Sequence, residues 1–351
     1  MAPQKINFIE IIMKKILALP ILITSLMASF TSNAQCTVNP TLQADSKFPL
    51  ALQGRLVYHS YVQYGDGSSN LFLKDFRFNT LTQINQPFWN IEDPMNAHFS
   101  PNGRYLTFMG KQNSRWNIFI WKTDSQFAPI NLSHHTDSSG GTSEDPKFSA
   151  DGNYIVYKNN GDVALMHMNY NDAANPFVNN LWRLTQDGYL SEESMPYLSS
   201  DGKSVFYSRG ARENSDLYRI DFTIQSGQLF VENPRLMAGR SGLAEYYPIV
   251  QNKSLYFVGW KNATARRDQV YSMSTDVYSQ PSELNLNDCN ADNSDPMSVD
   301  AANLFFSSTR GSNFYNLFMG NISTGKVWSL NKFGVNQMQK NQLGATYSAL
   351  R

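Results

Sequence analysis

Six short segments recur along the chain at a nearly constant period, and this repeat constrains the fold more than any other feature. Residues 144–152 and 194–202 each place a Pro near the start, a Ser three residues later and an Asp-Gly pair shortly after it. With the Pro as marker, the equivalent residues are Pro49, Ala97, Pro146, Pro196, Pro248 and Pro296, at spacings of 48, 49, 50, 52 and 48. A fixed period of this length indicates a repeat architecture in which each unit packs against its neighbours.

Each repeat carries four β-rich segments. The second segments are rich in aromatic and β-branched residues and cover residues 56–58, 105–108, 154–157, 204–207, 255–257 and 304–306. Such composition favours strands, and four short strands per repeat predict one blade of a propeller. We therefore expect an all-β fold, a six-bladed β-propeller of four-stranded antiparallel blades over residues 46–331, followed by a C-terminal tail over residues 332–351.

A Gly-containing turn joins the first two strands of three repeats. Asn102-Gly103, Asp151-Gly152 and Asp201-Gly202 supply the positive φ that a two-residue hairpin needs. Repeats five and six lack such a pair, so we expect turns of another type there.

The amino terminus has the pattern of an export signal. Lys14 and Lys15 precede an apolar run over residues 16–30, and Ser32-Asn33-Ala34 places small residues at a cleavage site. This pattern is typical of a secretory signal peptide over residues 1–34, with Met13 as the true start. Because the apolar core is shorter than the roughly 20 residues that span a bilayer, we expect cleavage rather than anchoring. The mature protein would then be periplasmic or secreted, with residues 35–45 as a short extension.

The repeats resemble a known bacterial family. Phe99-Ser100-Pro101-Asn102-Gly103, and Asp201-Gly202 followed by Asp216-Leu217-Tyr218, are similar to the WD40-like (PD40-type) repeats of TolB-like propellers. The resemblance covers roughly residues 46–331. It implies a fold rather than one activity, because propellers serve both as binding scaffolds and as enzymes.

Closure of the ring suggests a role for the two cysteines. Every repeat is expected to supply its own four strands, which leaves residues outside 46–331 as additions. Cys36 precedes the first blade and Cys289 lies in the loop between blades five and six, and these places are neighbours in a closed ring. An exported protein with two cysteines favours a Cys36–Cys289 disulfide across the seam, and the alternative is two free buried thiols.

Acidic residues recur in the loops that enter the innermost strands. The candidates for a ligand-binding face are Asp93, Glu144, Asp145, Glu193, Glu245 and Asp295, together with Arg209 and Arg310 after second strands. The acids either ring one end of the channel as a cation site or a surface for a basic partner, or they cap turns and bond backbone amides between blades. The arginines could grip carboxylates.

Histidine and tryptophan offer weaker signals. His98, His134 and His135 could approach one another as metal ligands, for which Ca²⁺ or Mn²⁺ would be the ion, or they are exposed loop and strand residues. No spaced ligand motif supports a metal, so the expected cofactor is none. Trp89 and Trp260 lie near loops and are candidates for exposed binding platforms.

Two functions remain open. The first is an exported scaffold that binds a protein or glycan through one propeller face, and we expect this rather than an enzyme. The second is a polysaccharide lyase acting on an acidic glycan, because oligogalacturonate lyases are propellers of related repeat type. Nucleic acid is not an expected partner, since 29 basic and 29 acidic side chains leave no net positive charge.

Overall fold

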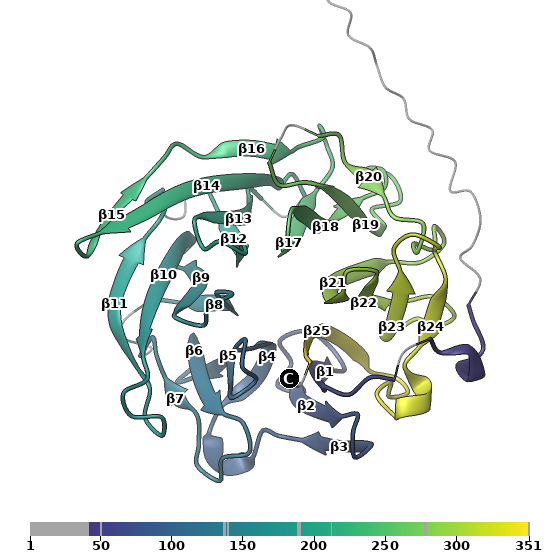
Figure 1. Ribbon diagram of the computed structural model, residues 1–351, viewed down its shortest axis with the longest axis horizontal. Coiled ribbons are helices and arrows are strands. Elements are labelled where there is room, and N and C mark those ends of the chain that lie inside the picture. The colour runs from purple at the N-terminus through teal and green to yellow at the C-terminus, as the bar shows by residue number, and fades with distance from the viewer. Residues whose placement is uncertain are drawn as a thin grey trace, which may run out of the picture. The chain divides into compact units, whose positions relative to one another are not determined.

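The computed structural model describes residues 42–349, apart from 50, 136–137, 139, 188–190, 212 and 277–278. In this part of the chain six antiparallel sheets stand radially around a common axis, with their innermost strands nearest to it (Figure 1). The predicted all-β, six-bladed propeller is confirmed. Short 3-10 helices accompany the strands: η1 (Asp45–Lys47), η2 (Pro87–Trp89) and η4 (Asn331–Phe333). No helix among the described residues is long and apolar enough to cross a membrane, and the expected signal peptide lies outside them.

The strands occupy four radial positions. The innermost strands of blades one to six are β25 (Asn341–Ser348), β4 (Glu92–Phe99), β8 (Ser143–Phe148), β12 (Glu193–Leu198), β17 (Glu245–Gln251) and β21 (Asn293–Asp300). The second strands are β1 (Arg55–Tyr61), β5 (Tyr105–Gln112), β9 (Tyr154–Asn159), β13 (Ser204–Arg209), β18 (Ser254–Trp260) and β22 (Asn303–Ser308). The third strands are β2 (Asn70–Asp75), β6 (Arg115–Lys122), β10 (Asp162–Asn169), β14 (Asp216–Gln225), β19 (Asp268–Ser274) and β23 (Asn316–Asn321). The outer strands are β3 (Thr80–Gln83), β7 (Ile130–Asn131), β11 (Phe177–Arg183), β15 (Gln228–Val231), β16 (Arg235–Ala238), β20 (Ser282–Glu283) and β24 (Val327–Ser329).

The first blade takes its innermost strand from the end of the chain. β25 pairs antiparallel with β1, and Figure 1 shows the yellow strand beside the purple one. The expectation that every repeat supplies its own four strands is therefore wrong for blade one, and residues 341–348 of the expected tail belong to the propeller. The described residues before β1, 42–49 and 51–54, form no strand, and β25 covers the edge of β1 that would otherwise be exposed. Gly54 permits the approach, because a Cβ there would lie 2.2 Å from the Ser348 carbonyl oxygen.

The turns after the innermost strands are of two kinds. In blades two to four the last paired residues leave six residues between them, for example between Phe99 and Leu106. The glycines of these loops have φ of 65°, 77° and 69°, so positive φ is confirmed, but the predicted two-residue length is wrong there. A serine hydroxyl closes each wider loop, as when Ser100 Oγ accepts a bond of 2.9 Å from the Tyr105 amide. Blades five and six use two-residue turns, such as the one between Gln251 and Ser254.

The hydrophobic core lies between neighbouring blades. One cluster joins Met109 and Ile118 of blade two to Ile155 and Met166 of blade three, and each of these side chains is at most 1% exposed. Burying one such side chain stabilises the fold by about 1.5–3 kcal/mol, so blade-to-blade packing holds the innermost strands in place. The end of the channel at which the innermost strands begin is called the entry face, and the end at which they finish is called the channel mouth.

Candidate functional site in the central channel

A bulge in each innermost strand shapes the channel. The residue before the marker has positive φ in blades two to six: Asn96, Asp145, Met195, Tyr247 and Asp295 have φ of 53°, 56°, 52°, 53° and 49°. In blade one the equivalent residue is Gly344 of β25, with φ of 59°, so the marker of that blade is Ala345 and the expected marker Pro49 is wrong. Pairing with the second strand shifts register at the same place in every blade. Pro lacks an N–H and is tolerated at such bulges, which explains the recurring Pro marker. The bulges bring six equivalent residues together around the channel.

Two of these six residues are aspartates that tie blades together. Asp145 accepts a bond of 2.7 Å from Asn96 Nδ2 in blade two and one of 3.3 Å from the Met195 amide in blade four. Asp295 accepts a bond of 2.9 Å from the Gly344 amide in blade one. Both residues were predicted for a ligand face, but these contacts fit the structural alternative, in which acids bond between blades.

Lys147 places a cation between the two aspartates. The residue is 7% exposed, and its Nζ lies 5.6 Å from the centre of the Tyr247 ring. Burial lowers the pKa of Lys147, while the charges of Asp145 and Asp295 act in the opposite direction. Asp145 and Asp295 come from blades three and six, on opposite sides of the ring (Figure 1). Lys147 is thus buried next to Tyr247 and interacts electrostatically with aspartates from two opposite blades.

Two histidines lie beside this cation. Burial and the nearby Lys147 charge lower the pKa of His59 and of His98 to about 3. Both rings are therefore neutral at pH 7. The Phe148 amide donates a bond of 3.2 Å to His98 Nδ1, while Nε2 is buried and has no hydrogen-bond partner among the described residues.

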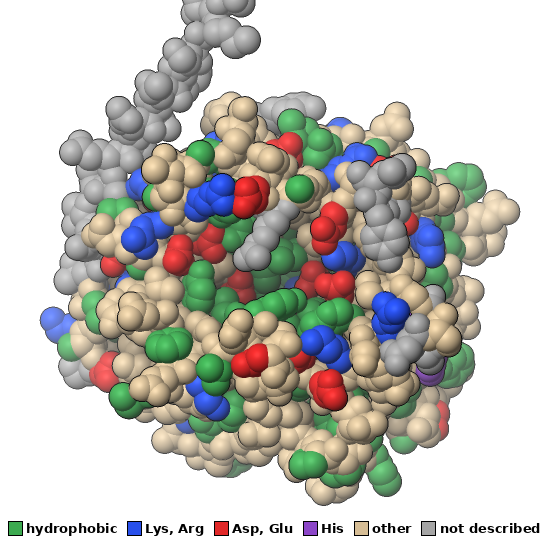
Figure 2. Space-filling view, turned by 180° about the vertical axis from the view of Figure 1, so that it is seen from behind, with side chains coloured by type: hydrophobic (Ala, Val, Ile, Leu, Met, Phe, Trp, Pro, Cys, Tyr) green, Lys and Arg blue, Asp and Glu red, His purple; other side chains and the backbone are tan. Residues whose placement is uncertain are grey.

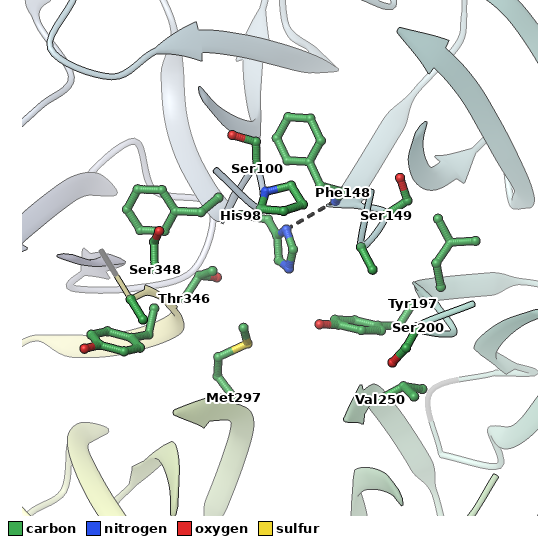
Figure 3. Close-up of a pocket in the computed structure, with 16 residues that line it drawn as sticks. His98, Ser100, Phe148, Ser149, Tyr197, Ser200, Val250, Met297, Thr346 and Ser348 are labelled. Carbon is green, nitrogen blue, oxygen red and sulfur yellow. Dashed lines mark hydrogen bonds between the residues drawn. The ribbon is translucent and has the colours of Figure 1, made fainter. Parts of the chain in front are cut away.

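A cavity of about 260 Å³ opens at the channel mouth above His98. All six blades line it, from His98 in β4 and Phe148 in β8 to Thr346 in β25. In Figure 3, His98 Nε2 points away from Phe148 toward the space that Tyr197 and Met297 border. The cavity is thus a partly apolar hollow with an imidazole N–H directed into it.

Three of the predicted acids lie at the entry face in ion pairs. Asp93 pairs with Lys111 at 2.8 Å, and Glu245 pairs with Arg240 at 2.6 Å. Glu193 is fully buried, accepts a bond from Thr185 Oγ1 and lies 3.6 Å from Arg209 Nε. Burial raises the pKa of Glu193 to about 7 and also raises the pKa of Glu245. In Figure 2, which views the face opposite to that of Figure 1, acidic and basic side chains are interspersed around the central hollow.

The remaining charged candidates also have protein partners. Glu144 lies 3.6 Å from Lys158 Nζ, and its pKa is raised by burial. Arg209 donates to Ser191 Oγ at 2.9 Å and to Asp187. Arg310 lies about 5 Å from the centres of two Phe rings and donates to the Asn293 side chain at 2.7 Å. Burial lowers the pKa of Arg310 to about 10. Arg209 thus already pairs with carboxylates of the protein, and Arg310 already donates within the fold, so a role for either in gripping a ligand carboxylate stays a prediction.

The three candidate metal ligands are not brought together. His98 lies near the channel mouth, whereas His135 Nε2 lies 2.9 Å from Ser143 Oγ at the start of β8. Phe148, the neighbour of His98, lies five positions after Ser143, so up to about 17 Å of strand lies between the two sites. His134 is exposed. No group of three His, Cys, Asp or Glu side chains in the described ranges could hold a metal ion.

The expected tryptophan platforms are buried. Trp89 is 4% exposed and packs beside Trp121 at 5.3 Å, and Trp260 is 9% exposed under Arg266. The prediction of exposed platforms is wrong, because both rings fill gaps beside or between strands.

An acid–tyrosine cluster between blades five and six carried no sequence signal. Asp268 accepts bonds from the Tyr246 hydroxyl at 2.5 Å and the Tyr315 hydroxyl at 3.4 Å. Burial raises the pKa of Asp268 to about 7. The sequence analysis also did not identify Lys147 as a site residue. The repeat nevertheless indicates it, because the residue after each marker occupies the same level of the channel. Reading those positions would have found His98, Lys147 and Tyr197 together.

Comparison with known proteins supports the fold. No protein-family model matches the chain, and no curated protein matches it. Among solved structures it is similar to TolB from Acinetobacter baumannii, with a TM-score of 0.60 and 14% identity over 86% of this chain and 68% of that one. It is also similar to a putative TolB from Agrobacterium tumefaciens, with a TM-score of 0.52 and 16% identity over 84% of this chain and 98% of that one. Hydrazine synthase of Kuenenia stuttgartiensis gives 0.61 and 12% identity, over 86% of this chain and 47% of that one. These similarities show a propeller fold like that of TolB.

Proposed function

We propose that this protein is an exported binding scaffold, a propeller of PD40-type repeats that holds a protein or glycan ligand at the channel mouth. The observation that carries the proposal is the cavity at that end, with all six innermost strands in its wall. The strands are held by blade-to-blade cores and by the Asp145 and Asp295 contacts, so the mouth is preorganised. A preorganised surface loses little entropy on binding.

The entry face gives a binding role less support. Its acids Asp93, Glu193 and Glu245 are already engaged by Lys111, Arg209 and Arg240. A ligand that drew one of these cations away would leave a buried carboxylate uncompensated, which is costly. We therefore assign the ligand to the mouth.

Export rests on the amino-terminal sequence. Lys14, Lys15 and the apolar run over residues 16–30 favour secretion across the inner membrane and cleavage near Ala34. The proposed site of action is accordingly the periplasm or the outside of the cell.

A polysaccharide lyase is the alternative, and the titration of the channel residues gives it less support. A lyase needs a base that accepts a proton near neutral pH. The pKa of His98 is lowered to about 3, and burial raises the pKa of Tyr246 well above its usual value. Neither group is poised for that step. If the protein were an active lyase, Asp268, whose pKa is raised to about 7, would be the first candidate for the base.

Binding and turnover can be separated in one experiment. The mature protein is immobilised and exposed to envelope extract from the native cells and to polygalacturonate, while the absorbance of unsaturated products is followed. We expect a ligand to be retained without product formation. A Ser200→Trp variant, which fills the mouth from its exposed rim, should lose the retained ligand.

The matched control is His134→Trp, which adds the same side chain to an exposed position away from the mouth. It should retain the ligand as the native protein does. Product formation in proportion to protein would favour the lyase instead. Equal retention by both variants would contradict a site at the mouth.

A further inference from the structure

His98 presents a hydrogen-bond donor to the cavity. The Phe148 amide donates to Nδ1, so Nδ1 carries the lone pair and the proton of the neutral ring is on Nε2. The residue is 7% exposed, and no described residue accepts from Nε2. A buried donor without an acceptor costs stability, so an acceptor supplied from outside the chain would be favoured there.

The other polar side chains of the wall are largely engaged. Ser100 Oγ donates to Asn102 Oδ1 at 2.9 Å, Ser149 Oγ to Asp151 Oδ1 at 2.5 Å, and Thr346 Oγ1 to the Ala97 carbonyl at 2.8 Å. The remaining wall includes Leu198, Val250 and Met297. The cavity therefore combines an apolar surface with the imidazole N–H of His98 and the hydroxyl of Tyr197, which points into the same space (Figure 3).

The size of the cavity limits the ligand. At about 30 Å³ per water, 260 Å³ corresponds to roughly nine water molecules. This is slightly below the usual range for drug-sized ligands, so it suits a small molecule or a single side group of a larger ligand.

We propose that the cavity binds an apolar group bearing a carbonyl or carboxylate oxygen, which accepts the hydrogen bond from His98 Nε2. The inference rests on the proposed function and names the chemistry that the mouth recognises. Lys147 lies at the equivalent position of the neighbouring strand, where Asp145 and Asp295 oppose its charge, so recognition rests on the hydrogen bond from Nε2 and applies to carbonyl and carboxylate oxygens alike. An ammonium group, which only donates, would leave Nε2 unpaired.

Three small probes of similar shape test this chemistry: phenylacetate, phenylacetamide and phenethylamine. The side-chain nitrogen resonances of ¹⁵N-histidine-labelled protein are recorded during titration with each probe. We expect phenylacetate and phenylacetamide to shift the His98 Nε2 resonance, with a dissociation constant on the order of 1 mM for ligands of this size. Phenethylamine should leave that resonance unchanged.

Two variants assign the effect to one atom. His98→Phe keeps a planar ring without the donor and should weaken phenylacetate binding about tenfold. His98→Gln retains an N–H donor and should bind with intermediate affinity. The control His134→Phe makes the same change at an exposed site and should bind as the native protein does.

The proposal is overturned if neither oxygen-bearing probe shifts His98, if phenethylamine binds equally well, or if His98→Phe binds phenylacetate with native affinity. Should His98→Phe fail to fold, the native probe series and His98→Gln still decide the matter. Probe binding without any retained macromolecule would refute the scaffold while leaving the cavity chemistry intact. A retained macromolecule without probe binding would support the scaffold and refute the proposed chemistry of the cavity.

Discussion

The Gly344 amide donates a hydrogen bond of 2.9 Å to Asp295 Oδ2, and this contact joins blade six to the strand that completes blade one. Gly344 and Asp295 occupy equivalent bulge positions in neighbouring innermost strands. The same position in blades two and three carries the Asn96–Asp145 bond. The boundary between blades six and one is therefore held at the same bulge position as the boundary between blades two and three, while the pairing of β25 with β1 closes the ring.

Removing β25 should open the ring. A chain that ends at Lys340 lacks the innermost strand of blade one and exposes the edge of β1. We expect it to lose cooperative thermal unfolding, measured by circular dichroism. A chain that ends at Ser348 keeps the strand and should unfold as the full protein does. Cooperative unfolding of the shorter chain would show that β25 is dispensable.

Substitution of Asp295 tests its contact with the Gly344 amide, which joins blades six and one. Asp295→Ala leaves the buried Gly344 amide without its acceptor and removes a counter-charge from Lys147, so we expect a loss of about 2–3 kcal/mol. The measurement is urea denaturation of the purified protein. Asp276→Ala removes an exposed partner of Lys253 and should change stability by less than about 0.5 kcal/mol. Equal losses in the two variants would contradict a special role for Asp295.

The depressed pKa of His98 predicts a loss of stability in acid. The pKa of His98 is about 3 in the folded protein and 6.5 in a model peptide, so the unfolded chain binds a proton first as pH falls. The native protein should therefore lose about 1.4 kcal/mol per pH unit relative to His98→Phe between pH 6 and pH 4. Urea denaturation at several pH values measures the difference. His134→Phe should show no such trend, and a pH-independent gap for His98→Phe would refute the assignment.

Glu193 should act in the opposite direction. Burial raises its pKa to about 7 from an ordinary 4.5, so the folded protein holds this proton more tightly than the unfolded chain. Stability from Glu193 is therefore present in acid and is lost as pH rises from about 4.5 to 7. The stability of Glu193→Gln relative to the native protein should rise by about 3 kcal/mol between pH 4 and pH 8. A constant difference across that range would show that burial does not perturb this carboxyl.

The Cys36–Cys289 disulfide stays a prediction, because Cys36 lies outside the described residues. Leu42 forms a bridge with Val327, and Gly325 lies against Asn285 in the loop that leads to Cys289. Cys36 is six residues from Leu42, a reach of at most about 20 Å. A disulfide enclosing about 250 residues would stabilise the fold by up to about 5 kcal/mol. Non-reducing peptide mapping should recover a cross-linked peptide pair, and two alkylated cysteines would rule it out.

The repeat could predict the fold but not its closure. The period near 49 residues and the strand composition were enough for six blades, because every blade repeats the same pattern. β25 continues the period, because Ala345 lies 49 residues after Pro296, but a series that starts at Pro49 already contains six markers, and Ala345 lacks the Pro that most markers have. Pairing between β1 and β25 joins residues nearly 300 apart, and local pattern carries no information at that distance.

The site was predicted less well than the fold, because the type of a residue and its spacing in the sequence do not tell in which direction its charged side chain points. The acids lie in the first residues of the innermost strands rather than in the expected loops before them. Their partners, such as Lys111 for Asp93 and Arg240 for Glu245, become visible only in three dimensions. Lys147 resembled an ordinary strand lysine, but the bulge at Asp145 places it in the channel. Trp89 and Trp260 illustrate the converse, since closeness to a loop did not mean exposure.

The most direct test of the account asks which end of the channel contacts a ligand. A photoreactive benzoylphenylalanine is placed at Ser200, on the rim of the mouth, or at the exposed His134, and each protein is irradiated in envelope extract from the native cells. If the ligand binds at the channel mouth, position 200 should give a discrete cross-linked product that excess unlabelled protein abolishes. Position 134 should give none. A product from position 134 alone, or equal products from both, would contradict a binding site at the channel mouth.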